Sequence, residues 1–206
     1  GDDAKGEYIY KFVPAGRFEA ANPKAARHLL DEGTLYVARL NDDGSGQWLA
    51  LVHGQNGLTA ENGFASQEEV LLNARAAADR AGATPMDRPE WAAVHPATGE
   101  VYVTLTNNDG RGDKQPTDKA YPRPHKLHGQ ILRFNEQGAD PTATAFAWEL
   151  FLLAGEARGA KDKDGKPVPA NLTGTINGDL FSSPDGLAFD AAGRLWIQTD
   201  YDDIEP

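Results

Sequence analysis

The residues of this chain that first suggest chemistry are two carboxylates, Glu90 and Asp185, which stand at the same place in a repeated motif. In each copy an acidic residue begins a short apolar run, a turn ending in glycine follows, and an alternating apolar segment closes the unit. The alignment pairs Glu90 with Asp185, Gly99 with Gly193, and Tyr102 with Trp196, with one residue fewer in the second turn. One structural unit used twice therefore presents an acidic residue twice.

Carboxylates that equivalent units bring together can bind a shared cation. Several of them make a cage of hard oxygen ligands, which suits Ca²⁺ and ferric iron. Cations of this kind support phosphoryl transfer because they neutralise charge on the phosphoryl oxygens in the transition state. The residue types also allow a plainer interpretation, in which Glu90 forms an ion pair with Arg88 and Asp185 caps a turn after Pro184.

Five further residues complete the candidate site. Asn107 and Asn108 end the first copy's strand and could offer side-chain carbonyls to calcium, although Asn is also a common turn residue. Arg88 and Arg123 could each bind a phosphate through two nitrogens, or could form ion pairs on a surface rich in carboxylates. Asp200 follows the strand of the second copy and is either a further ligand or a solvated acid.

The elements that must position these residues are mostly strands. Alternating apolar residues and turn signals predict strands at 7–13, 33–40, 47–52, 91–95, 101–106, 129–134 and 144–153. A helix is expected from Ser66 to Ala81, because Ser66 can cap its start and Gly82 can end it. The segments 109–126 and 155–179 have the composition of long loops.

Four strands in meander order between Glu90 and Leu153, followed by a restart, are typical of a β-propeller blade. The sequence therefore predicts an all-β fold of propeller-like antiparallel meander blades, forming a partial ring, with a short helix in an inter-blade insertion. Residues 1–206 would be part of a single propeller domain, with about two to two and a half blades of a larger ring. The alternative is a self-contained β-sandwich.

Composition limits the classes of partner. The chain has 31 acidic and 20 basic residues, and its formal net charge of −11 argues against nucleic-acid binding. No apolar run is long enough to span a membrane. The absence of cysteine excludes disulfides and thiolate ligands within these 206 residues.

The motifs, taken together, resemble the PhoX family of alkaline phosphatases. They occur in family order over nearly the whole chain. The matching residues are Gly33–Arg39, Gly46–Trp48, Ala74–Ala77, Gly82–Glu90, Gly99–Asn108, Ser183–Leu187, Gly193–Ile197 and Thr199–Asp200.

The resemblance implies a fold, a chemistry and a location. The family is similar to a six-bladed propeller with extra loops, and its central site hydrolyses phosphate monoesters with iron and calcium. Its members are large secreted bacterial proteins that carry a twin-arginine export signal, so the resemblance implies a periplasmic or secreted protein. The match covers a central part of the family's length, and that signal is absent from these residues.

The chain also departs from the family pattern. Where family members have an Asn and a His in a segment ending Gly-His-Ile, this chain has Lys126 and Gln130. A ligand or substrate contact from that loop is therefore in question. The family's iron-bridging cysteine lies upstream of the matched region, so we expect these 206 residues alone to be inactive.

Two functional hypotheses follow. In the first, the chain is a fragment of a metal-dependent phosphatase that takes a small phosphoester substrate at an iron and calcium site. In the second, it is a non-catalytic, calcium-stabilised propeller segment that acts as a binding scaffold. In either case a partial ring leaves strand edges bare, so we expect association with the missing parts of the parent chain or with itself.

Overall fold

The computed structural model describes residues 1–201. The chain forms two compact units. The first combines Gly1–Glu7 and Leu40–Gly46 with the chain from Pro85 onward, and the second combines Tyr8–Arg39 with Gln47–Thr84. Within residues 1–201 there is no helix that is both long and apolar enough to cross a membrane.

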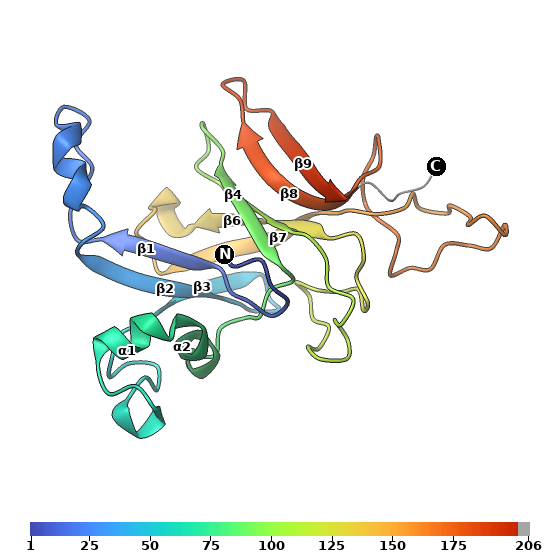
Figure 1. Cartoon of the computed structure of the whole chain (residues 1–206). Helices are drawn as coiled ribbons and strands as arrows, with labels where there is room; N and C mark the ends of the chain where they lie inside the picture. The colour runs from blue at the N-terminus through green and yellow to red at the C-terminus, as the bar shows by residue number, and fades with distance from the viewer. Residues whose placement is uncertain (202–206) are drawn as a thin grey trace. The chain divides into compact units, whose positions relative to one another are not determined.

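The second unit packs helices on a small sheet (Figure 1). The strand β2 lies between β1 and β3, and β1 pairs antiparallel with β2, with Phe12 opposite Leu35. Its core joins Val37 of β2 to helical residues such as Val70 and Ala77. The elements are β1 (Tyr10–Pro14), η1 (Pro23–His28), β2 (Gly33–Leu40), β3 (Ser45–Ala50), η2 (Ala60–Asn62), α1 (Gln67–Leu72) and α2 (Ala74–Ala81).

The one helix expected at 66–81 is two helices. Its ends are confirmed, since Ser66 Oγ accepts a hydrogen bond from the Glu69 backbone N–H at 3.3 Å and Gly82 adopts a φ of 79°. The break lies at Asn73, whose φ of −113° and ψ of 40° are not helical. Asn73 donates a side-chain hydrogen bond to the Glu69 carbonyl at 2.9 Å. An Asn side chain that competes for backbone partners in this way ends a helix, and the apolar periodicity does not reveal it.

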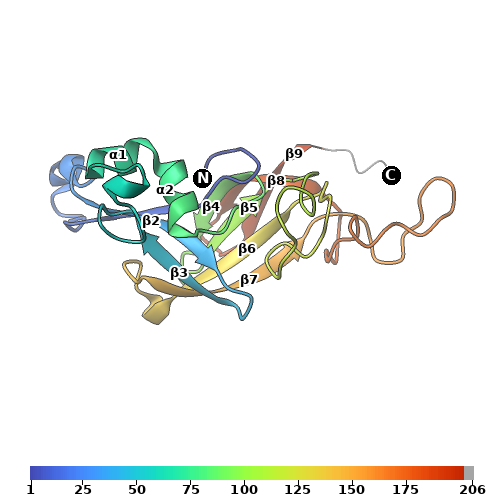
Figure 2. The ribbon, with the colours of Figure 1, turned by 90° about the horizontal axis from the view of Figure 1, so that it is seen from below.

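The first unit contains the predicted blade. Its four strands follow one another in space in chain order and pair antiparallel, as Figure 2 shows. They are β4 (Pro89–Val94), β5 (Val101–Leu105), β6 (Gln130–Glu136) and β7 (Ala145–Leu153), with η3 (Gln137–Ala139) between the last two. The meander, the all-β class and the short helical insertion are confirmed, while completion of the ring remains a prediction.

A hairpin of β8 (Ser182–Phe189) and β9 (Leu195–Tyr201) forms a separate two-stranded antiparallel sheet. In the same unit β8 packs against β4 and β5. Leu187 of β8 is buried with Tyr102 of β5 and Ile131 of β6. This apolar contact holds the starts of the two acid-bearing strands, β4 and β8, beside β5.

The sequence repeat is also a structural repeat. Tyr102 lies opposite Ala93 in the first copy, and Trp196 lies opposite Ala188 in the second. Both turns end on a left-handed glycine, with φ of 74° at Gly99 and 78° at Gly193. The ladder register shifts between Pro89 and Ala92 in one copy, and between Pro184 and Leu187 in the other. The bulge therefore falls at the acidic residue in each copy.

The residue before each proline of the repeat has an unusual backbone. Arg88 has a φ of 52° and Ser183 a φ of 50°. A residue other than glycine adopts this left-handed region at a cost of about 1 kcal/mol or more, and a following proline favours extended conformations instead. The same strained entry thus turns the chain into both acid-bearing strands.

We predict that Ser183→Gly is more stable than Ser183→Ala by about 1 kcal/mol, because both lose the hydroxyl but only glycine fits a positive φ. Urea unfolding of the two variants measures the difference. The same pair of substitutions at Ser45, which lies in β3, should favour alanine. Equal stability of the two Ser183 variants would contradict the left-handed assignment.

Candidate active site

One guanidinium organises the acidic residues at the start of β4. Arg88 donates from Nε to Asp3 Oδ1 at 2.7 Å and from Nη2 to Asp3 Oδ2 at 3.0 Å. Its Nη2 also lies 3.7 Å from Glu90 Oε1 and 3.6 Å from Asp200 Oδ2. The ion pair of Glu90 with Arg88, one of the two interpretations of the sequence, is therefore present. The sequence did not point to Asp3, since only its residue type marks it.

The carboxylates beside Arg88 are electrostatically crowded. Burial, followed by the hydrogen bond to Asp3 and the negative charges of Asp3 and Asp185, raises the pKa of Glu90 to about 7. The hydrogen bond from Arg88 holds the pKa of Asp3 below its ordinary value. Neighbouring carboxylates of this kind need either a shared proton or a cation to stay together.

Thr104 in β5 and Thr106 just after it form hydrogen bonds to the starts of both acid-bearing strands, β4 and β8. Trp91 N, at the bulge of β4, donates to Thr104 Oγ1 at 3.0 Å, and Thr104 Oγ1 donates to the Asp185 carbonyl at 2.6 Å. Thr106 Oγ1 lies 3.4 Å from both Glu90 Oε1 and the Pro184 carbonyl. The hydroxyls therefore hold the Glu90 side chain and the main chain at Pro184 and Asp185 against one neighbouring segment.

Asp185 carries an unsatisfied atom. Its Oδ1 is buried and has no hydrogen-bond partner. A buried carboxylate oxygen without a partner is costly, and native proteins rarely leave one unless a ligand or ion satisfies it. This oxygen, with the raised pKa of Glu90, fits a site that takes a hard cation.

The two asparagines at the end of β5 have different surroundings. Asn108 is fully buried, donates to Asp87 Oδ1 at 2.8 Å, and accepts a hydrogen bond from Gly110 N at 3.0 Å. Asn107 is half-buried, and its Nδ2 reaches Ser183 Oγ at 3.5 Å. The structure thus brings Asn107 toward the start of β8, whereas the Asn108 side chain is used within the fold.

The Arg123 side chain donates hydrogen bonds to main-chain carbonyls. Its Nη1 donates to the carbonyls of Ala154 at 2.8 Å and Thr173 at 3.0 Å, and its Nη2 donates to the Gly129 carbonyl at 2.7 Å. Burial lowers its pKa to about 10. A phosphate that used this guanidinium would have to displace bonds that hold three loop segments together, so Arg123 positions the loops around the site.

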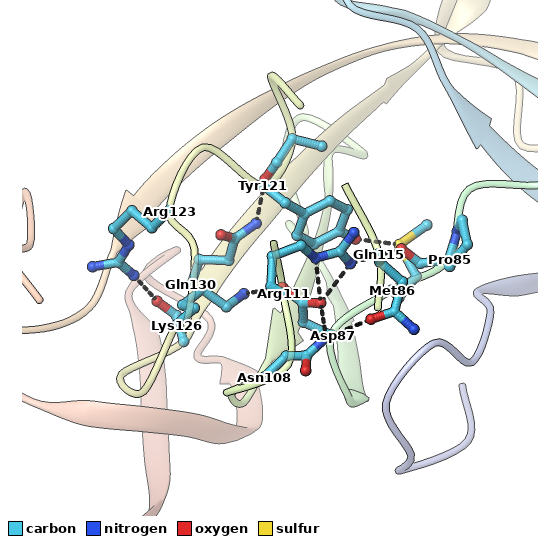
Figure 3. Close-up of polar contacts among 12 residues, drawn as sticks. Pro85, Met86, Asp87, Asn108, Arg111, Gln115, Tyr121, Arg123, Lys126 and Gln130 are labelled. Atoms are coloured by element: carbon cyan, nitrogen blue, oxygen red, sulfur yellow. Dashed lines mark hydrogen bonds and ion pairs between the residues drawn. The ribbon is translucent and has the colours of Figure 1, made fainter. Parts of the chain in front are cut away.

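Beneath the site lies a wholly buried ionic cluster, shown in Figure 3. Arg111 Nε donates to Asp87 Oδ1 at 2.9 Å. Lys126 Nζ lies 2.9 Å from Asp87 Oδ2 and forms an ion pair with it. The ring of Tyr121 stacks on Arg111, 4.0 Å from its guanidinium carbon. Since Asp87 directly precedes Arg88, the cluster anchors the strained entry to β4.

The cluster places two cations against one carboxylate. Although burial alone would raise it, the pKa of Asp87 is held below its ordinary value by the charges of Lys126 and Arg111. Burial lowers the pKa of Lys126 to about 8 against the pull of Asp87. Gln130 is also fully buried and donates from Nε2 to the Ala120 carbonyl at 2.7 Å. Both positions that depart from the family pattern therefore lie inside the fold.

Sequence reasoning did not find this cluster. Asp87 lies in the segment Met86–Arg88, but its partners Arg111 and Lys126 come from the long loop after β5, whose path no periodicity predicts. Arg111 belongs to an unremarkable Arg-Gly-Asp tripeptide. The one sequence signal for the cluster was that Lys126 and Gln130 differ from the residues of the family pattern.

Between residues 1 and 201, no group of three or more His, Asp or Glu side chains is arranged as a finished metal site. The residues present nevertheless fit part of one. Glu90 and Asp185 supply hard oxygen atoms, Asp185 Oδ1 needs a partner, and the crowded charge at Glu90 needs compensation.

Known proteins match this chain along its length. The family model described as alkaline phosphatase PhoX matches residues 1–205. The whole chain is 46% identical to Pseudomonas fluorescens PhoX, whose structure was solved in complex with vanadate, a transition state analogue, and superposes on it with a TM-score of 0.88. The chain spans 36% of the length of that protein's chain. The search of curated proteins finds no match.

The buried cluster predicts how stability changes with pH. Between about pH 8 and 10 the unfolded chain binds a proton that folded Lys126 has lost, so the Lys126 contribution becomes more favourable as pH rises. The stability of Lys126→Met relative to wild type should therefore fall between pH 7 and pH 10, by a change on the order of 1–3 kcal/mol.

Urea unfolding of wild type and variant at the two pH values measures the change. The exposed Lys114, in the same loop, is the matched control, and Lys114→Met should have the same small effect at both. A stability difference for Lys126→Met that does not depend on pH would contradict the lowered pKa of Lys126.

Proposed function

Because the chain belongs to the PhoX family of alkaline phosphatases, we propose that the protein hydrolyses phosphate monoesters at a cation centre to which Glu90 and Asp185 contribute ligands. The observation that carries the proposal is the repeated strand start. Thr106 Oγ1 contacts the Glu90 carboxylate of β4, and Thr104 Oγ1 bonds the main-chain carbonyl of Asp185 in β8, so one neighbouring segment holds both acid-bearing strand starts. The vanadate complex of the similar P. fluorescens protein supports a phosphate-like substrate.

Arg88 is the proposed phosphate-binding residue. Its guanidinium fork already holds the two oxygens of the Asp3 carboxylate. A phosphate offers oxygens in the same fork geometry. We propose that substrate competes with Asp3 for this fork, and that Arg123 keeps the surrounding loops in place through its three carbonyl contacts.

Glu90 and Asp185 would hold calcium or iron, with Asn107 and Asp200 as additional oxygen ligands. When bound, such ions neutralise the charge on the phosphoryl oxygens. Glu90 then loses the proton that its crowded surroundings favour, and Thr104 and Thr106 keep both carboxylate-bearing strands in place. Asn108 is proposed to orient Asp87 through its hydrogen bond.

An apolar surface supports the proposed assembly with the rest of a longer chain. Trp91 and Trp196 are 57% and 61% exposed. They line a cavity of about 300 Å³ together with Leu187 and Ile197. Exposed apolar surface of this kind marks an interaction site. We propose that a further propeller segment covers it, in a protein exported to the periplasm or the medium, as the family resemblance implies.

Glu90→Gln in the full-length protein should lower phosphomonoesterase activity by about two orders of magnitude or more, because it removes a charged ligand and keeps the shape. Asp185→Asn should behave alike, since the repeat places it equivalently. Asp190→Asn, which changes an acid in the turn between β8 and β9, is the control and should leave activity near wild type. Full activity of Glu90→Gln would contradict the assignment.

The 206-residue chain alone should show no turnover of an aryl phosphate, because it supplies only part of the proposed ligand set. A phosphatase assay with added calcium and iron checks this. The matched control is the full-length protein under the same conditions. Sustained calcium-dependent turnover by the 206 residues alone would contradict the proposal that the site needs further segments.

A further inference from the structure

A second cavity, of about 340 Å³, opens in the first unit. Its size is within the range of small-molecule sites. Its polar wall is formed by Asn107, His128, Ser182 and Ser183 together with the ion pair of Lys5 and Asp109.

This cavity adjoins the carboxylate cluster. Three segments each supply one residue to the surroundings of Arg88 and Glu90, and each supplies another residue, at most two positions away, to the cavity wall. These pairs are Asp3 and Lys5 in the N-terminal segment, Thr106 and Asn107 after β5, and Asp185 and Ser183 in β8. A phosphate ester whose phosphoryl group lay at Arg88 and Glu90 would therefore have its alcohol part beside this wall.

The wall is a connected series of neutral hydrogen-bonding groups. Asn107 Nδ2 lies 3.5 Å from Ser183 Oγ, which lies 3.3 Å from Ser182 Oγ. Ser182 Oγ lies 3.1 Å from His128 Nδ1. Hydroxyl groups can donate or accept, so this series can reverse its direction to suit a ligand hydroxyl.

The cavity carries little net charge. Lys5 Nζ lies 2.6 Å from Asp109 Oδ1, so the two charges compensate each other. Burial, and then the nearby positive charge of Arg123, lower the pKa of His128, which keeps the imidazole neutral. Leu127 is the single apolar side chain in the wall among the described residues. The neutral groups of the wall can hydrogen-bond a hydroxylated ligand, and the wall offers no uncompensated cation to a second phosphate.

We propose that this cavity binds the alcohol part of the phosphate ester and favours a hydroxylated alcohol, such as a sugar, over an aryl group. The inference rests on the proposed phosphatase function and specifies its substrate class. A ligand hydroxyl could exchange hydrogen bonds with the series of Asn107, Ser183 and Ser182, whereas an aryl group could not. Sites built to hydrogen-bond a substrate hydroxyl discriminate strongly against analogues that lack it.

The test compares glucose 6-phosphate with phenyl phosphate as substrates of the full-length protein. Ser182→Ala should lower kcat/KM for glucose 6-phosphate about 3- to 10-fold more than for phenyl phosphate, the loss expected for one neutral hydrogen bond. Leu127→Trp, at a position that is 49% exposed, should narrow the cavity and lower kcat/KM for the larger glucose 6-phosphate more than for phenyl phosphate. Thr144→Val, at an exposed position before β7, removes a hydroxyl elsewhere and should leave the ratio unchanged.

Inhibition of phenyl phosphate hydrolysis by free glucose gives a second readout. The inhibition constant of glucose should rise in Ser182→Ala and in Leu127→Trp. The factor should be about the same as the change in the ratio of kcat/KM for glucose 6-phosphate to kcat/KM for phenyl phosphate. Equal losses for both substrates, or unchanged inhibition by glucose, would overturn the alcohol subsite and leave the phosphatase proposal standing. Failure of the wild-type protein to hydrolyse either ester would overturn the phosphatase proposal itself and the subsite with it.

Discussion

The Arg88 guanidinium is the interaction on which the candidate site depends. It faces Asp3, Glu90 and Asp200, and without its charge three carboxylates would repel one another in a partly buried place. Burial, and then the neighbouring carboxylates Asp3 and Asp185, raise the pKa of Glu90 to about 7 despite the charge of Arg88. The site is thus arranged to accept further positive charge, which is a suitable starting condition for binding metal ions.

A buried ion cluster supports this arrangement from below. Arg111 and Lys126 both face Asp87, the residue before Arg88, and the backbone at Arg88 is left-handed. Strain of this kind persists only where surrounding contacts hold it. The buried charges are costly in isolation, so their role is better understood as fixing the entry to β4 than as adding stability. Ser183 repeats the same backbone at β8 without such a cluster at its side among the described residues.

The sequence predicted the parts of the fold that periodicity controls. The meander of β4 to β7, the repeat of Glu90 and Asp185, and the ends of the helical insertion followed from local patterns. It did not predict contacts made by loops, because nothing in the residues around 111–126 tells which buried atoms they meet. For the same reason Asp3 was missed and Arg123, which is bound to three carbonyls, looked available for phosphate.

Metal analysis of the full-length protein tests the central claim most directly. Wild type and the Glu90→Gln/Asp185→Asn double variant would be compared after dialysis against metal-free buffer, with far-UV circular dichroism to verify folding. The account predicts iron together with calcium in the wild type, and loss of bound metal from a double variant that stays folded. Calcium alone in the wild type would favour a scaffold, and equal metal content in both proteins would contradict a ligand role for these carboxylates.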